Sequence, residues 1–178
     1  MAAEQIILVD GHDQEVGVGD KLQTHIEGAL HRAFSIFIFD AKRRLLLQKR
    51  AKTKYHSGGL WSNTCCGHPR PGESTEAAAH RRLKHEMSFD CELREAFDFL
   101  YRAQLPDGLF EHEYDHVLVG EFDGDPVPNA TEVEDWKRVD MSELRRGLRE
   151  NPDDYSYWLR AALETTEWQR VNALMRVE

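Results

Sequence analysis

The sequence predicts a single domain of the mixed α/β (α+β) class. Stretches typical of β-strands alternate along the chain with stretches in which apolar residues recur at helical spacing. The chain has 178 residues, 40% of them hydrophobic, which is enough to bury one sizeable core. No internal repeat and no long linker divides it, so we expect residues 1–178 to form one domain.

Six segments are typical of strands because β-branched, aromatic and other apolar residues concentrate in them. In chain order they span residues 5–10, 32–40, 45–50, 97–104, 111–122 and 135–139. Only a short, mostly polar stretch separates the second segment from the third, which predicts an antiparallel hairpin.

A helix is predicted from Ser74 to about Met87. Ser74 is a preferred N-cap residue, because its hydroxyl can accept a hydrogen bond from a backbone N–H of the first turn. Ala79, Leu83 and Met87 recur every four residues and give the helix a buried stripe.

Two further helical regions follow. Asp140 and Glu143 have the spacing of a capping box, which predicts a short helix that ends before Pro152. From residue 154 onward the chain is helix-like. An apolar stripe continues near its end at Val171, Leu174 and Met175.

Composition narrows the possible partners. The formal net charge of −9 argues against nucleic-acid binding, which generally needs a basic face. The N-terminus does not resemble a signal peptide, and the strongest apolar stretch, residues 33–39, is too short to span a bilayer. Three cysteines, two of them adjacent, form no disulfide framework, which indicates a reducing compartment. We therefore expect a cytoplasmic protein with no membrane partner.

Positive charge is concentrated between residues 42 and 54, where seven lysines and arginines lie. On an acidic protein such a cluster can bind a small polyanion. For residues 42–44, a hairpin rim that faces solvent is an equally good interpretation. Arg50 and Lys54 lie closer to the motif described next, and we favour substrate binding for them.

Residues 63–69, with the sequence Asn-Thr-Cys-Cys-Gly-His-Pro, form the most informative pattern in the chain. Counting on from Gly67, Glu73 follows after five positions and Arg81 after seven more, and Glu86 ends the pattern. This spacing resembles the Nudix box, written G-x5-E-x7-R-E-U-x-E-E-x-G-U with U aliphatic.

The departures from that box are equally informative. Arg82 and His85 stand where the Nudix box has glutamates, and Ser88 stands at its last glycine. Those glutamates hold the metal that activates water for diphosphate hydrolysis, so the exchange argues against hydrolysis. Together with the run Cys66–Pro69, the departures resemble type I isopentenyl diphosphate isomerase over nearly the whole chain. The resemblance implies a Nudix-type mixed sheet sandwiched between helices, and interconversion of isopentenyl and dimethylallyl diphosphate in isoprenoid biosynthesis.

The resemblance also implies a metal site. The family places two histidines before the cysteine motif, one within it and a Glu-x-Glu pair after it. The implied ligands of one divalent ion (Mn, Zn or Mg) are His25, His31, His68, Glu111 and Glu113. Residues two apart on a strand point to the same side, so both glutamates can face one ion. No metal-binding role is expected for His12, His80, His112 and His116.

The implied substrate is a small prenyl diphosphate, whose negative charge needs cations. The resemblance implies that Mg²⁺ binds with the diphosphate, held by the Glu86 carboxylate and the backbone carbonyl of Cys66. Arg82 and Glu86 are four residues apart and share a helix face, so both can reach one ligand. The side-chain cations expected at the substrate are Lys21, Arg50, Lys54 and Arg82.

The double-bond shift needs one proton delivered and another removed in a site shielded from water. The resemblance assigns these tasks to Cys66 and Glu113, with Tyr101 assisting the glutamate and the Trp158 ring stabilising a cation. Core packing is the alternative for both aromatic residues. Adjacent side chains on an extended segment face opposite ways, so Cys65 is expected to pack in the core.

Two other functions remain open. A Nudix hydrolase of a small organic diphosphate would need glutamates at positions 82 and 85, and this chain lacks both. A non-catalytic module that binds a metal or a diphosphate would not need both proton-transfer residues. By analogy with the family, we expect a monomer.

Overall fold

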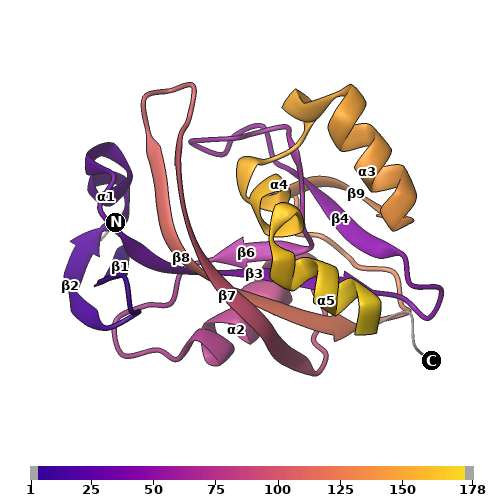
Figure 1. Ribbon diagram of the computed structural model, residues 1–178, viewed down its shortest axis with the longest axis horizontal. Helices are drawn as coiled ribbons and strands as arrows, with labels where there is room; N and C mark the ends of the chain where they lie inside the picture. Colours follow the sequence, from indigo (N-terminus) through magenta and orange to yellow (C-terminus); the bar gives the residue numbers. More distant parts are fainter. Residues whose placement is uncertain (1–3, 175–178) are drawn as a thin grey trace.

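A computed structural model describes residues 4–174 and shows a mixed β-sheet with helices on both faces (Figure 1). The strands are β1 (Gln5–Val9), β2 (Glu15–Asp20), β3 (His31–Phe39), β4 (Leu45–Arg50), β5 (Trp61–Ser62), β6 (Cys65–Gly67), β7 (Leu93–Gln104), β8 (Phe110–Glu121) and β9 (Val133–Val139). The helices are α1 (Lys21–Glu27), α2 (Thr75–Met87), α3 (Met141–Glu150), α4 (Tyr157–Glu164) and α5 (Thr166–Leu174), and a short 3-10 helix, η1 (Pro152–Asp154), follows α3.

Strand β3 organises the sheet. It pairs antiparallel with β1, β4 and β6, and it pairs parallel with β8 along its whole length. Strand β8 also pairs antiparallel with β7, and β4 pairs antiparallel with β5 and β9. The predicted hairpin is confirmed, because Phe39 at the end of β3 pairs with Leu45 at the start of β4.

All six predicted strands are present, with ends that differ by a few residues. The sequence did not indicate β2, α1, β5 and β6. Strand β2 has only two apolar side chains, Val16 and Val18, both exposed, and two glycines, which are depleted in strands, so its strand signal is weak. Strands β5 and β6 have two and three residues, which is too short for any periodicity to be read.

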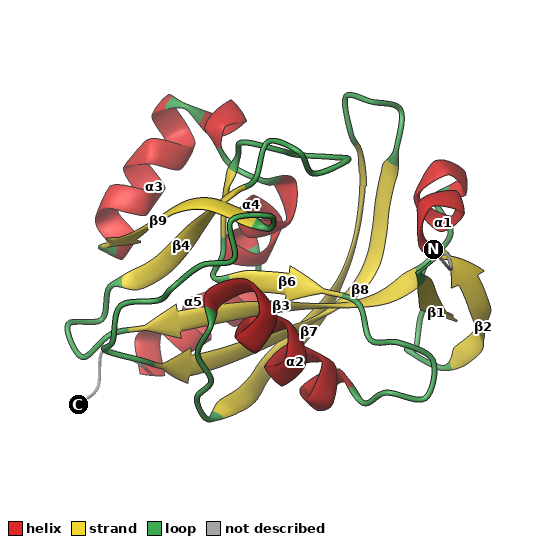
Figure 2. Ribbon diagram, turned by 180° about the vertical axis from the view of Figure 1, so that it is seen from behind, coloured by secondary structure: helices red, strands yellow, loops and turns green. Residues whose placement is uncertain are grey.

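Helices cover both faces of the sheet, as the predicted fold class requires. On one face α2, seen in front in Figure 2, buries Leu83 and Met87 in the same cluster as Ile36 of β3. On the other face lie α3, α4 and α5, and Trp168 of α5 packs on Phe37 with ring centroids 4.6 Å apart. Each large apolar side chain buried in this way contributes about 1.5–3 kcal/mol.

The helix ends partly match the sequence signals. Ser74 is the N-cap of α2, and its side chain accepts a hydrogen bond from the backbone N–H of Ala77. Asp140 is the N-cap of α3, and this helix ends before Pro152 as predicted, but Asp140 makes no side-chain cap hydrogen bond, so the capping box itself is wrong. The helix-like region after residue 154 divides into α4 and α5 at Thr165, whose backbone is extended. Met175 lies outside the described residues.

Helices in residues 4–174 are all too short or too polar to cross a membrane.

Candidate active site and metal centre

Three neighbouring strands place a row of polar side chains across the sheet. His31 lies opposite Glu113 in the parallel β3–β8 pairing, and Tyr101 lies opposite the same glutamate in the antiparallel β7–β8 pairing. Residues directly opposite one another point to the same face of a sheet, so the register brings the three together. The Tyr101 hydroxyl donates a 2.5 Å hydrogen bond to Oε2 of Glu113. Nε2 of His31 lies 3.5 Å from Oε1 of Glu113.

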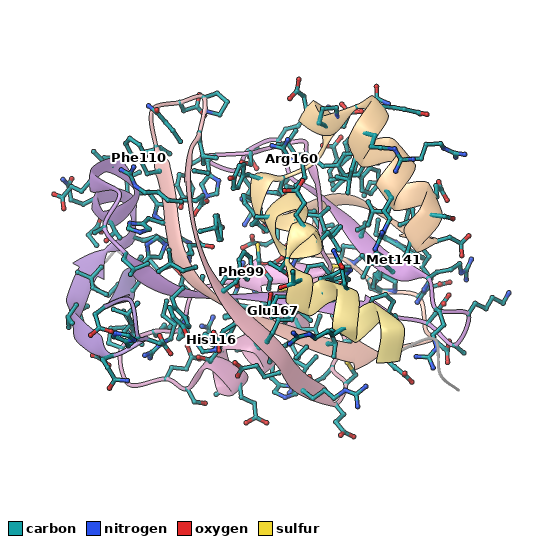
Figure 3. All side chains as sticks on the ribbon, in the orientation of Figure 1. Phe99, Phe110, His116, Met141, Arg160 and Glu167 are labelled. Atoms are coloured by element: carbon teal, nitrogen blue, oxygen red, sulfur yellow. The ribbon has the colours of Figure 1, made fainter. Side chains whose placement is uncertain are left out.

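A tight turn after α1 adds a second histidine. The helix ends at Gly28, whose φ of 67° lies in the left-handed region that glycine adopts without strain. Phe110, near the tip of the β7–β8 hairpin (Figure 3), packs so closely here that a Cβ on Gly28 would lie 3.1 Å from Cβ of Phe110. The turn brings His25 back toward His31, with ring centroids 4.8 Å apart.

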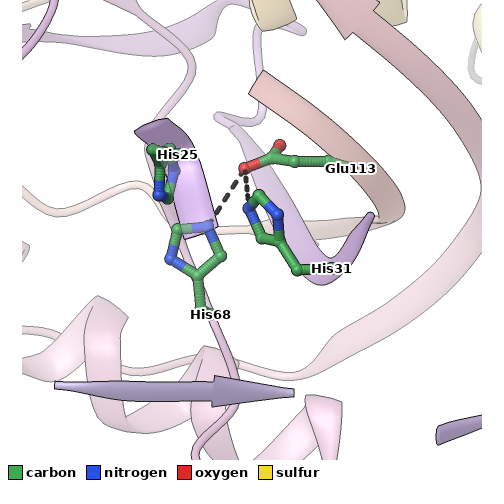
Figure 4. A group of neighbouring side chains, drawn as sticks. All are labelled: His25, His31, His68 and Glu113. Carbon is green, nitrogen blue, oxygen red and sulfur yellow. Dashed lines mark hydrogen bonds and ion pairs between the residues drawn. The ribbon is translucent and has the colours of Figure 1, made fainter. Parts of the chain in front are cut away.

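The third imidazole comes from the residue that follows β6. Nε2 of His68 lies 3.0 Å from Oε1 of Glu113, and its ring centroid lies 5.0 Å from that of His31. Figure 4 shows one oxygen of Glu113 between His31 and His68, with His25 beside them. One ligand atom from each of these four residues lies within 4.8 Å of the others, so the group can hold a metal ion.

Hydrogen bonds select the nitrogen that His25 and His31 present to this group. Nδ1 of His25 lies 2.6 Å from the carbonyl oxygen of Lys21, and Nδ1 of His31 lies 2.9 Å from that of Ala29. A carbonyl only accepts, so Nδ1 carries the proton and the lone pair of Nε2 is free. Both Nε2 atoms are buried and have no hydrogen-bond partner among the described residues, as ligand atoms would.

Burial sets the charge of these groups. It lowers the pKa of His25, and it lowers the pKa of His68 to about 3, so both imidazoles are neutral near pH 7. Burial alone would raise the pKa of Glu113, but the nearby imidazoles of His31 and His68 outweigh it and lower that pKa. Burial and the charge of Glu113 raise the pKa of Glu111. Neutral imidazoles and carboxylates are the donors that a divalent transition ion takes, so the residues fit such an ion.

Glu111 departs from the expected arrangement of five ligands around one centre. It belongs to a second group, with His25 and His56, so the two groups overlap at His25. Oε2 of Glu111 lies 3.4 Å from Nε2 of His25, and Oε1 lies 3.5 Å from Nε2 of His56. Burial and the charge of Arg50 lower the pKa of His56 to about 2, so it too is neutral. The sequence did not single out His56, because it lies in an irregular loop outside every recognised motif.

The two adjacent cysteines face opposite sides of β6, as the alternation of an extended segment predicts. Cys65 is fully buried in the core cluster beneath α2, whereas Cys66 lines the cleft. Burial raises the pKa of the Cys66 thiol to about 12, although the nearby Arg50 guanidinium opposes this. The thiol is therefore protonated at neutral pH. Nη1 of Arg50 lies 3.9 Å from the Cys66 sulfur.

Both aromatic residues expected at the site are tied to it by their polar atoms. Burial and the charge of Glu113 raise the pKa of Tyr101, so its hydroxyl remains a donor. The indole N–H of Trp158 lies 2.9 Å from Oγ of Ser62. This bond fixes the ring in the cleft wall, where the guanidinium carbon of Arg50 lies 5.0 Å from the ring centroid.

The opposite end of the cleft carries cations that are paired with carboxylates. Arg82 forms an ion pair with Glu86 one helical turn away, and a second with Glu132 at 3.3 Å. Lys54 also forms an ion pair with Glu132. Burial opposes ionisation of Glu132, but the Lys54 hydrogen bond and the Arg82 charge lower its pKa to about 2. Gln48 donates a 2.8 Å hydrogen bond to the other oxygen of Glu86.

One cleft unites these parts, and its volume is about 590 Å³ when the open solvent at its mouth is included. Ten of the thirteen residues expected at the site line it: Lys21, Arg50, Lys54, Cys66, His68, Arg82, Glu86, Glu111, Glu113 and Trp158. The other three, His25, His31 and Tyr101, contact the two glutamates from behind. Lys21 forms a 3.0 Å ion pair with Glu4, a cleft residue that the sequence did not indicate.

Residues 29–161 match the family model of the NUDIX domain, so the fold and the site define a Nudix-class protein. Solved structures agree on the fold. A protein from Deinococcus radiodurans superposes with a TM-score of 0.70 at 17% identity, covering 83% of this chain and 90% of that one. The MutT protein from Methanosarcina mazei superposes with a TM-score of 0.64 at 17% identity, covering 80% and 95%.

Relatives in sequence define the family more closely. The chain is 57% identical over 161 residues to "Isopentenyl-diphosphate Delta-isomerase 2" of Aromatoleum aromaticum, covering 90% of this chain and 85% of that protein. It is 52% identical over 174 residues to the protein of the same name from Photorhabdus laumondii, covering 94% and 98%. The chain belongs to the isopentenyl-diphosphate Delta-isomerase family.

Proposed function

We propose that this chain interconverts isopentenyl and dimethylallyl diphosphate. The observation that carries the proposal is a single cleft in which Cys66 and Glu113 lie between a cation-rich end and a histidine-rich end. A proton donor and a proton acceptor are what a shift of a double bond between neighbouring carbons requires. The names of the relatives support this assignment. Hydrolysis is disfavoured, because Arg82 and His85 stand at positions where a Nudix hydrolase has glutamates.

The proton steps fall to Cys66 and Glu113. In one direction, one group delivers a proton to the terminal alkene carbon while the other removes a proton from the allylic carbon next to the diphosphate-bearing carbon. The roles exchange in the reverse direction, so no electrons are gained or lost. The protonated Cys66 thiol can give up a proton, and the ionised Glu113 carboxylate can take one. Tyr101 holds Glu113 in place through its hydroxyl.

The histidine-rich end would hold one divalent ion, Mn²⁺, Zn²⁺ or Mg²⁺, through His25, His31, His68, Glu111 and Glu113. Such an ion would supply positive charge that makes the Glu113 carboxyl a stronger acid. At the other end Glu86 and the Cys66 carbonyl would hold Mg²⁺ with the diphosphate. The side-chain cations assigned to the diphosphate are Lys21, Arg50, Lys54 and Arg82.

The remaining expectations concern the setting in the cell. We infer a cytoplasmic monomer whose partner is the small prenyl diphosphate alone. The formal net charge of −9 supports the expectation that nucleic acids and anionic membrane surfaces are not partners.

The test is incubation with isopentenyl diphosphate and a divalent metal in deuterated water, followed by NMR. We expect dimethylallyl diphosphate to form without a redox cofactor and to carry solvent deuterium, because both catalytic groups exchange protons with water. Cys66→Ser is the matched control and should form product at least about 100-fold more slowly. Release of phosphate with the alkene unshifted would overturn the proposal in favour of a hydrolase.

A further inference from the structure

His56 lies in the loop between β4 and β5 and is buried, with 7% of its surface exposed. Its ring is stacked on that of His25, with centroids 5.7 Å apart and planes inclined by 27°. A buried imidazole in a loop normally has a hydrogen-bond partner for each polar nitrogen. The partner of Nδ1 is Oγ of Ser57 at 3.4 Å, and the nearest carboxylate to Nε2 is Glu111.

The geometry around Glu111 differs from that of an ordinary hydrogen-bonded carboxylate. Its two oxygens face one imidazole nitrogen each, at 3.4 Å for His25 and 3.5 Å for His56. Both distances exceed the 2.7–3.2 Å expected of an N–H···O bond. Oε2 of Glu111 and Nε2 of His25 are buried with no hydrogen-bond partner among the described residues. Atoms that approach one another without bonding are typical of ligands that share a cation.

The spacing is compatible with coordination. Ligand atoms on an octahedral ion with bonds of about 2.1 Å lie about 3.0 Å apart when adjacent and about 4.2 Å apart when opposite. The ligand atoms of His25, His56 and Glu111 all lie within 4.8 Å of one another. The same limit holds for the group of His25, His31, His68 and Glu113. His25 belongs to both groups, so the six donors form one continuous cluster.

We propose that His56 is a sixth protein ligand of the divalent ion held at the histidine-rich end of the cleft. The inference rests on the proposed function only in assuming that this end binds an ion. Four imidazoles and two carboxylates then surround the ion. Six donors rich in nitrogen select an octahedral first-row ion such as Mn²⁺, Fe²⁺ or Co²⁺ over tetrahedral Zn²⁺ and over Mg²⁺, which prefers oxygen. With every coordination position taken by protein, the ion acts on substrate only through Glu113.

Binding of the ion by His56 would also hold one wall of the cleft in place. The backbone carbonyl of His56 accepts a 3.3 Å hydrogen bond from Nη2 of Arg50, whose guanidinium lies over the Trp158 ring. The edge of the His56 ring meets the same tryptophan, with centroids 5.9 Å apart. Ion binding at His56 therefore orders the loop that carries Lys54 and positions two residues of the substrate wall.

The first test counts imidazoles on the metal without measuring catalysis. In the Co²⁺-loaded protein, each ligating imidazole gives one strongly shifted ring N–H proton signal that disappears in deuterated water. We expect four such signals in the wild type, three in His56→Ala and four in His112→Ala. His112 is the matched control, because it neighbours Glu111 in sequence but bonds through Nδ1 to the carbonyl of Gly28. Three signals in the wild type, or no loss in His56→Ala, would overturn the proposal.

Affinity and stoichiometry provide a second test. Competition with a chelator should show about 10–100-fold weaker Co²⁺ binding in His56→Ala and little change in His112→Ala. Titration should end at one ion per chain. Two ions per chain would overturn the single six-ligand site, and unchanged affinity would limit His56 to packing. His56→Gln keeps the polar volume if the alanine variant does not fold. Isomerase activity of the wild type is measured separately, so the ligand inference can fail while the proposed function stands.

Discussion

The two ends of the cleft differ in how their buried charges are compensated. At the cation end, Lys54 and Arg82 are already paired with Glu132 and Glu86. At the histidine end, Glu111 and Glu113 face imidazoles, two of which burial keeps neutral, and among the described residues neither carboxylate forms an ion pair with a lysine or an arginine. Burying unpaired carboxylates is costly unless a cation compensates them. The difference supports the proposal of a resident ion at the histidine end and of a diphosphate that binds and leaves at the cation end.

Removing one imidazole from the histidine end should have the largest effect on metal content and activity. His68→Ala should lose the tightly held ion, because it removes the nitrogen closest to Glu113, and turnover should fall below detection. Metal content by mass spectrometry and the isomerase assay measure the two effects. His80→Ala is a matched control, since that ring pairs with Asp90 away from the cleft. Full metal content together with full activity in His68→Ala would show that the histidine end is not a metal site.

Replacing Cys66, which lies between the two ends, should reduce activity almost as strongly. Cys66→Ala should lower kcat by about 10²–10⁴-fold, the usual contribution of a positioned proton-transfer group. Metal content should not change. Cys65→Ala is the control; it should keep kcat and cost about 1 kcal/mol of stability from a small core cavity. An epoxide-bearing diphosphate analogue should label Cys66 alone by mass spectrometry. Labelling of Cys65 instead would reverse the assignment.

A smaller effect is expected at the cation end. Glu86→Gln should weaken the use of Mg²⁺ and diphosphate by at least about tenfold, because a proposed magnesium ligand loses its charge. The tightly held ion at the histidine end should stay bound. Titrating Mg²⁺ in the steady-state assay, alongside metal analysis, separates the two ions. If Glu86→Gln lost the resident ion as well, the two ends would form one continuous metal site.

The smallest expected effect is the pH dependence of the stability of the chelator-treated protein. The pKa of His68 is about 3 in the folded chain, against an unperturbed value of 6.5, so between these values the unfolded chain binds a proton that the folded chain does not. Stability should therefore rise with pH across this window, by up to about 1.4 kcal/mol per pH unit for this residue. The raised pKa of Glu111 acts in the opposite direction. The comparison that isolates His68 is therefore urea unfolding of the wild type and His68→Gln at several pH values, and the variant should show the flatter profile.

The sequence predicted those parts of the molecule that have a periodicity or a motif. The concentration of apolar and aromatic residues in 32–40 and 111–122 predicted β3 and β8, and the four-residue repeat of Leu83 and Met87 predicted α2. The Glu-x-Glu spacing placed two carboxylates on one face of a strand, and the structure has them there. The alternation along residues 65–66 separated a core cysteine from a cleft cysteine.

The missed parts depend on contacts between distant segments. His56, Glu4 and Glu132 belong to loops or strand edges, and no local pattern distinguishes them from solvated residues. They reach the cleft because other elements bring them there, as when Lys54 and Arg82 converge on Glu132. The sequence also did not predict that Glu111 belongs to a second group of possible ligands, because only the tertiary structure shows that Glu111 lies next to His56.

The shared register of β7, β8 and β3 has a consequence for which changes of length the chain can tolerate. Side chains alternate across a strand, so inserting one residue within β8 ahead of Glu113 would exchange the inward and outward positions of part of the strand. With the insertion between Glu111 and Glu113, one of the two glutamates would point away from the cleft, and either His112 or Tyr114 would point toward it instead. The tip of the hairpin at residues 105–109 lies outside this register and can vary in length. Related chains should therefore differ in length at that tip. The number of residues in β8, from Glu111 through the segment paired with β3, should stay the same.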